Sequence, residues 1–142
     1  MQTYRRIPVQ KDEIIPIAEK MRADGIYLVM IHGYLDREAV PVISYDYAVG
    51  EAIESYTVTG ETEFPSISGI YDTAAEWPER ELNELFGWSF EGLDVSKRLF
   101  LPEDLLETQG KGQIMVKPLE ELRALNIQEL NVSGELAKEE NE

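Results

Sequence analysis

The amino-acid sequence predicts an α+β fold. An N-terminal helix packs on a small antiparallel β-sheet, followed by a helical turn, a second helix and an extended C-terminal segment. Residues 11–24 space their apolar side chains as one face of a helix does, whereas residues 25–59 alternate as β-strands do. After residue 60, prolines, polar residues and renewed helical spacing indicate a change of structure.

The first helix is expected over residues 11–24. Ile14, Ala18 and Met21 fall on one face of this helix and are expected to enter the core. Gly25 follows at the position where helices commonly end in a left-handed residue, so the helix is expected to stop there.

A meander of antiparallel strands is expected next. Residues 25–35, 40–49 and 52–59 are rich in β-forming side chains and are separated by short polar turns. Residues 25–35 are largely apolar on both faces, which predicts a central strand covered on each side, at least in part by partners. Residues 4–9 alternate as well and are a candidate for an additional strand.

Helical structure returns in the second half of the chain. Ser66 is expected to cap a short helical turn that opens at Phe64. A longer helix is expected to run from Thr73 to Phe86 and to end at Gly87.

The chain divides into one domain and an extension. Residues 1–104 are expected to form the domain. Residues 105–142 are expected to be a C-terminal extension with a short amphipathic helix at 118–125 and an acidic tail from Glu135.

Composition excludes several classes of function. The net charge of −15 argues against binding to nucleic acid or to an anionic membrane, since both need an excess of Lys and Arg. The absence of cysteine excludes disulfides and thiolate-bound metals, and a single histidine excludes a histidine-rich metal site. No apolar run is long enough to span a membrane and no signal peptide is evident, so a cytoplasmic protein is expected.

The glutamates of the second helix are the first candidates for chemistry. Glu79 and Glu81 are expected to face different sides of the helix and so not to form a catalytic pair. Glu81 and Glu84 can be neighbours, which leaves a carboxylate-dependent hydrolase as a hypothesis that requires a concave pocket around them. Arg80 has two interpretations: a solvated pair with Glu84, or a partly buried arginine that orders a neighbouring chain.

Other motifs do not indicate catalysis. His32 has no second histidine or cysteine to complete a metal site and is interpreted as structural. Residues 77–101 carry a surplus of aromatic and apolar side chains, of which a partner is expected to cover some. These side chains are Trp77, Phe86, Trp88, Phe90, Leu99, Phe100 and Leu101. The residues by themselves indicate an acidic domain that binds rather than catalyses.

The same segment resembles a known family, the thirty-kilodalton subunit of respiratory complex I, the NADH-quinone oxidoreductase. The resemblance lies in the order of short motifs, which is matched without a gap from Ala74 to Asp104. The motifs are Ala-Ala-Glu-Trp at 74–77, Glu-Arg-Glu at 79–81, Glu-Leu-Phe-Gly at 84–87, Phe-Glu-Gly at 90–92 and Lys-Arg-Leu-Phe-Leu-Pro-Glu-Asp at 97–104.

The sequence departs from the family pattern at three places. Glu84 stands where the family has Asp, residues 93–96 replace its His-Pro-Asp-Leu turn, and residues 105–113 lack its usual continuation. With the short chain, these departures make the sequence most similar to the short subunit of Ech-type energy-converting NiFe hydrogenases.

The resemblance implies a non-catalytic docking subunit in the peripheral arm of a membrane-bound, ion-translocating oxidoreductase, on the cytoplasmic side. No cofactor is expected in this chain; the NiFe centre and iron–sulfur clusters are expected in its partners, a hydrogenase-like large subunit and a small iron–sulfur subunit. The expected interface residues are Glu79, Arg80, Glu81, Phe86, Phe90, Arg98, Glu103 and Asp104. A stand-alone adaptor or assembly factor is the alternative, ahead of the hydrolase.

Overall fold

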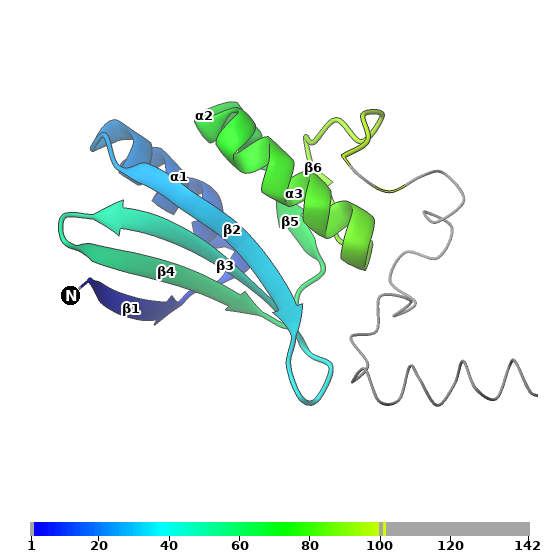
Figure 1. Ribbon diagram of the computed structural model, residues 1–142, viewed down its shortest axis with the longest axis horizontal. Helices are drawn as coiled ribbons and strands as arrows, with labels where there is room; N and C mark the ends of the chain where they lie inside the picture. The colour runs from blue at the N-terminus through cyan, green and yellow to red at the C-terminus, as the bar shows by residue number, and fades with distance from the viewer. Residues whose placement is uncertain (1, 100, 102–142) are drawn as a thin grey trace, which may run out of the picture.

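The α+β fold is confirmed in the computed structural model, which describes residues 2–99 and 101 (Figure 1). The elements in chain order are β1 (Thr3–Pro8), the 3₁₀ helix η1 (Lys11–Glu13), α1 (Ile14–Ala23), β2 (Tyr27–Leu35), β3 (Pro41–Val49), β4 (Ala52–Thr59), β5 (Glu63–Pro65), α2 (Ser68–Tyr71), α3 (Thr73–Phe86) and β6 (Ser89–Glu91). The proposed domain boundary at residue 104, the short helix at 118–125 and the acidic tail lie outside the described residues.

The main sheet has four strands in the order β1-β4-β3-β2. The expected antiparallel meander is confirmed, because β3 pairs antiparallel with both β2 and β4. The candidate strand at residues 4–9 forms as β1 and pairs parallel with β4, with Arg6 opposite Ser55.

The prediction that residues 25–35 form a central strand is wrong. β2 lies at the edge of the main sheet, and its pairing with β3 shifts in register between Leu28 and Met30. Because this bulge breaks the alternation, Leu28 and Ile31 are both buried, whereas Tyr27 and Met30 are exposed. In β2, apolar residues on both faces therefore belong to an edge strand that exposes one of its faces.

Helix α1 packs on one face of the sheet, behind it in Figure 1, as its apolar stripe predicts. Ile14, Ala18 and Met21 are all buried in the main hydrophobic core. Gly25 has a φ of 71° and ends this segment before β2 begins.

A small second sheet was not expected from the sequence. β5 and β6 pair parallel and place Phe64 opposite Phe90. Ser66 therefore does not cap a helical turn opening at Phe64: α2 begins later, at Ser68, with Ile67 in the N-cap position. The backbone of Ser66 donates instead to the carbonyl of Glu91, 2.9 Å away, in line with this sheet.

Helix α3 runs alongside β2 and ends as predicted (Figure 1). Gly87 has a φ of 71° and its N–H donates to the carbonyl of Asn83 at 2.9 Å. The Asn83 side chain then donates to the carbonyl of Trp88 at 2.8 Å, which directs the chain back toward the core. There Trp88 packs over Gly33 of β2, where an added Cβ would lie only 2.5 Å from the indole.

Candidate functional site

The charged residues of α3 differ in burial. Glu79, Arg80 and Glu84 are buried, with 0%, 4% and 4% of their surface exposed. Glu81 is exposed, and Trp77 is 58% exposed. The expectation that Glu79 and Glu81 face different ways is therefore confirmed, and each buried charge requires a partner.

Glu79 binds the segment between β5 and α2. Its carboxylate accepts hydrogen bonds from the Ser66 hydroxyl at 2.5 Å and from the Ile67 backbone N–H at 2.8 Å. Burial raises the pKa of Glu79 from 4.5 to about 7, and the two hydrogen bonds only partly offset this effect. Glu79 thus holds the start of α2 to the middle of α3.

Arg80 binds a second segment, residues 93–99, which we call the strap. Its guanidinium donates to Glu76 at 2.6 Å and to the carbonyl of Asp94 at 3.1 Å. Of the two interpretations of Arg80, the solvated pair with Glu84 is wrong: Arg80 is buried, and it forms an ion pair with Glu76, one turn earlier. A buried arginine with a backbone acceptor fixes the start of the strap against the helix.

Glu84 binds the end of the strap. Its two carboxylate oxygens accept hydrogen bonds from the backbone N–H groups of Leu99 and Leu101, at 2.5 and 3.1 Å. A carboxylate that accepts from backbone N–H groups makes charge-assisted hydrogen bonds, which are stronger than neutral ones. Arg80 and Glu84 together therefore anchor both ends of the strap.

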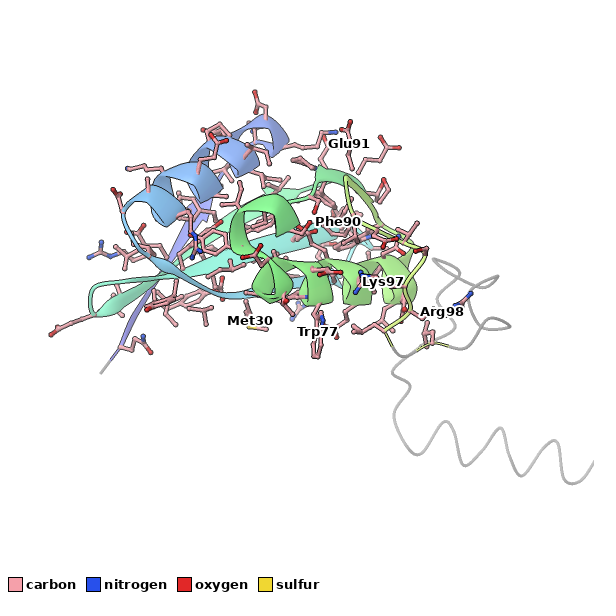
Figure 2. The ribbon with its side chains drawn as sticks, turned by 90° about the horizontal axis from the view of Figure 1, so that it is seen from above. Met30, Trp77, Phe90, Glu91, Lys97 and Arg98 are labelled. Atoms are coloured by element: carbon pink, nitrogen blue, oxygen red, sulfur yellow. The ribbon has the colours of Figure 1, made fainter. Side chains whose placement is uncertain are left out.

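The aromatic residues around Gly87 pack into the core beside the end of α3. Phe90 is buried, and its ring centroid lies 5.5 Å from that of Phe64. Phe86 is partly buried and stacks on Trp88 at 4.8 Å between ring centroids. Figure 2 shows Phe90 within the body of the domain, whereas Trp77 points outward from α3.

A groove of about 740 Å³ lies between α3 and the strap. It is lined by Thr73, Ala74, Trp77, Pro78, Arg80, Glu81, Lys97, Arg98 and Leu99. Three of the expected interface residues meet here: Arg80, Glu81 and Arg98. Glu103 and Asp104 lie outside the described residues.

Trp77 and Lys97 are groove residues that the expected interface does not include. The sequence marks Trp77 as one of the surplus aromatic residues and as the last residue of the motif at 74–77. Its exposure and its place in the groove distinguish it from the buried Trp88. The sequence marks Lys97 only as the first residue of the motif at 97–104, and its place in the groove depends on where the strap runs.

Other candidate sites show structural contacts. Nε2 of His32 lies 3.3 Å from a carboxylate oxygen of Asp46 on the neighbouring strand. Glu84, needed for the hydrolase hypothesis, points its carboxylate at backbone amides of the strap.

Among residues 2–99 and 101, no group of three or more His, Cys, Asp or Glu side chains is placed to hold a metal ion. Within the same residues, no helix has the length and apolar character needed to cross a bilayer.

Fold and site together define an α+β domain whose helix α3 binds two neighbouring segments through buried charges and lines a groove with one of them. A family model described as the 30 Kd subunit of the respiratory-chain NADH dehydrogenase matches residues 7–119, which is most of the chain. The chain belongs to this family, and the resemblance seen in the sequence is confirmed.

The curated relatives agree with this assignment. The NAD(P)H-quinone oxidoreductase subunit J of Synechococcus sp. (strain WH7803) is 44% identical over 45 residues, which are 32% of this chain and 24% of the relative. The protein of the same name from Prochlorococcus marinus (strain MIT 9303) is 50% identical over 40 residues, 28% of this chain and 21% of the relative. The subunit J of the organellar chromatophore of Paulinella chromatophora is 27% identical over 122 residues, 69% of this chain and 63% of the relative. This chain thus covers less than two thirds of each of these relatives.

Proposed function

We propose that the chain is a non-catalytic docking subunit in the peripheral arm of a membrane-bound, ion-translocating oxidoreductase. In this role it packs on the cytoplasmic side against the large catalytic subunit, beside the small iron–sulfur subunit. The observation that carries the proposal is the family match over residues 7–119, which includes both α3 and the strap. Iron–sulfur clusters, and a NiFe centre if the assembly is a hydrogenase, would belong to the partner subunits.

The eight interface residues divide into two roles under this proposal. Glu81 and Arg98 are exposed and would contact the partner directly. Glu79, Arg80 and Phe90 are buried, so they would act by holding α3, the strap and β6 in the shape that the partner recognises. Phe86 is partly buried and would offer its exposed edge, while Glu103 and Asp104 would extend the interface along the chain.

The type of assembly has two candidates. The curated relatives are named NAD(P)H-quinone oxidoreductase subunits, which supports a complex I-like assembly. The sequence departs from the family pattern at residues 93–96 and 105–113. These departures support an energy-converting, ferredoxin-linked NiFe hydrogenase. Nickel analysis of the purified complex separates the two: stoichiometric nickel indicates the hydrogenase, and its absence beside intact iron–sulfur clusters indicates the complex I-like assembly.

Co-purification tests the docking role. An affinity tag on this chain should recover the large subunit and the iron–sulfur subunit from solubilised membranes in constant proportion. Arg98→Glu should weaken this recovery by about tenfold because it reverses a charge at the groove. Arg37→Glu, an equal change in the exposed turn between β2 and β3, is the matched control and should leave recovery unchanged.

Two results would reject the docking role. Recovery of the tagged chain alone from intact membranes would overturn it outright. Recovery of the partners in small and variable proportion would favour the adaptor or assembly factor, which visits the complex and leaves. A hydrolase would require substrate turnover by the isolated chain that Glu81→Gln abolishes.

A further inference from the structure

One face of the main sheet is open. Helix α1 packs on the opposite face, and no helix in the described part of the chain crosses this one (Figure 1). Residues paired directly across neighbouring strands point to the same side, so the register assigns side chains to the open face. Tyr4 lies in one row with Tyr27 across the four strands, and Arg6 lies in the next row with Met30. Leu28, between these rows, points into the core instead.

The exposed side chains of the open face are of the types that protein interfaces favour. Tyr4, Tyr27, Met30 and Tyr34 are 55%, 76%, 46% and 38% exposed. Tyr, Met and Arg are enriched at interfaces, whereas Lys and Glu are depleted. Neither Lys nor Glu occurs among the paired residues of the open face, although the chain contains 28 Asp and Glu residues. The open face therefore differs in composition from the acidic chain as a whole.

The charged groups of the open face are engaged within the chain. The Arg6 guanidinium donates to the Tyr34 hydroxyl at 2.6 Å, so two side chains from opposite edges of the sheet meet over β3 and β4. Nε2 of His32 lies 3.3 Å from a carboxylate oxygen of Asp46. Arg6 and Asp36 line the same hollow of about 360 Å³ at one end of the face. Groups of opposite charge thus lie close together, and the face presents little net charge.

We propose that the open face binds a flat, apolar and weakly charged surface of a partner subunit in the same complex. Tyr27 and Met30 leave water on binding, and the hollow beside Arg6 receives one apolar side chain. A charged partner surface would lose its hydration against side chains that offer it no counter-charge. The proposal rests on the proposed docking function and adds which surface docks and the chemistry of what covers it.

Two other occupants fit the open face less well. Two copies of this chain repel each other, since each carries a net charge of −15. Residues 102–142 of this chain are rich in Glu, which a face of low charge does not match. Both occupants are outcomes that the experiment distinguishes.

The size of the open face also favours a partner that binds elsewhere as well. Strand spacing and rise give the face an area of roughly 400 Å². A stable interface buries about 800 Å² on each partner. The open face is therefore one part of a larger contact. Figure 2 shows Met30 directed to the same side of the molecule as the exposed Trp77, so this contact can continue onto α3.

Photo-crosslinking in the complete complex identifies what covers the open face. The photoreactive residue p-benzoylphenylalanine replaces Tyr27 in one variant and Met30 in a second, and crosslinked peptides are identified after purification through a tag on this chain. Both positions should crosslink to one other subunit, within segments rich in apolar residues and poor in charge. Leu35 is the matched control position, because it is 47% exposed on the same strand and its pair with Pro41 lies on the opposite face.

Each other result overturns the proposal. Crosslinks to residues 102–142, or to a second copy recognised by isotope labelling, would mean that this chain covers the face. Crosslinks to a strongly charged segment would reject the charge argument, and no crosslink above that at Leu35 would mean an uncovered face. If the tagged wild-type chain recovers no partner subunits, the proposed docking function fails too. Partner recovery without crosslinks at the open face rejects this inference alone.

Charge insertion supplies an independent measurement. Met30→Glu places a carboxylate on the open face and should speed dissociation from the complex by about tenfold or more. Leu35→Glu makes the same change at a side chain of nearly equal exposure, 47% against 46%, on the other face of β2, and should leave dissociation unchanged. Near-ultraviolet circular dichroism checks that both variants keep the fold. Equal dissociation rates for the two variants would overturn the proposal.

Discussion

The buried and the exposed residues of helix α3 serve different purposes. Glu79, Arg80 and Glu84 are buried, and each binds a segment of the same chain. Trp77 and Glu81 are exposed and line a groove, to which the buried Arg80 also contributes. A segment rich in charged residues is therefore not necessarily exposed to solvent. In α3, the buried charged residues fix the shape of the surface that the exposed residues form.

Replacement of Arg80 tests the buried charges of α3 most severely. Arg80→Ala removes the donor to Glu76 and to the Asp94 carbonyl and leaves a space beneath the strap. We expect the free energy of unfolding to fall by about 4 kcal/mol, the range found when one partner of a buried ion pair is removed. Urea unfolding followed by tryptophan fluorescence measures this. A loss below about 1 kcal/mol would mean that Arg80 behaves as a surface residue.

The pH dependence of stability tests Glu79. Its pKa is raised from 4.5 to about 7 in the folded protein, so folding is favoured when the carboxyl is protonated, and this stability is lost as the pH rises from 4.5 through about 7. Relative to Glu79→Gln, the wild-type protein should lose about 2 kcal/mol between about pH 5.5 and about pH 8. The comparison with the variant cancels the titration of other groups. A constant difference across this range would mean that burial does not raise this pKa.

Glu84 tests whether the strap depends on the helix. Glu84→Gln keeps the shape but replaces one acceptor oxygen by a donor, which faces a backbone N–H of Leu99 or Leu101. We expect a loss of about 1.5 kcal/mol and faster hydrogen exchange at these two amides. Exchange at Gly87, whose amide bonds to Asn83 within the helix end, serves as the internal control. Unchanged exchange at Leu99 would show that the strap is held by other contacts.

Trp77 should have the smallest effect on stability and a large effect on assembly. Trp77→Ala removes an exposed side chain, so the free energy of unfolding should change by less than about 0.5 kcal/mol. Recovery of partner subunits should nevertheless fall by about tenfold or more. Trp88→Ala, on the buried tryptophan, should show the reverse pattern of strong destabilisation. Equal effects of the two variants on stability would remove the distinction between the exposed and the buried tryptophan.

Local patterns predicted much of the fold correctly. The apolar stripe of residues 11–24 is the buried side of α1, and the helix that ends at Gly87 is α3. The position of β2 at the sheet edge was not predicted, because a bulge between Leu28 and Met30 changes which side chains face the core. The β5–β6 sheet was not predicted either, since the parallel pairing of Phe64 with Phe90 joins residues far apart in the sequence.

What the sequence by itself determined was the class of fold, the family and the segment that matters, because helical spacing, strand alternation and the order of short motifs are local properties. Only the tertiary structure decided which of the charged residues are inside. Nothing in the local sequence separates the buried charges Glu79, Arg80 and Glu84 from the exposed Glu81. The three are buried because each binds a partner that reaches α3 only after folding. These partners are Ile67, Asp94 and Leu99. Burial and hydrogen-bond pairing depend on these long-range approaches, and so does the groove that α3 and the strap enclose.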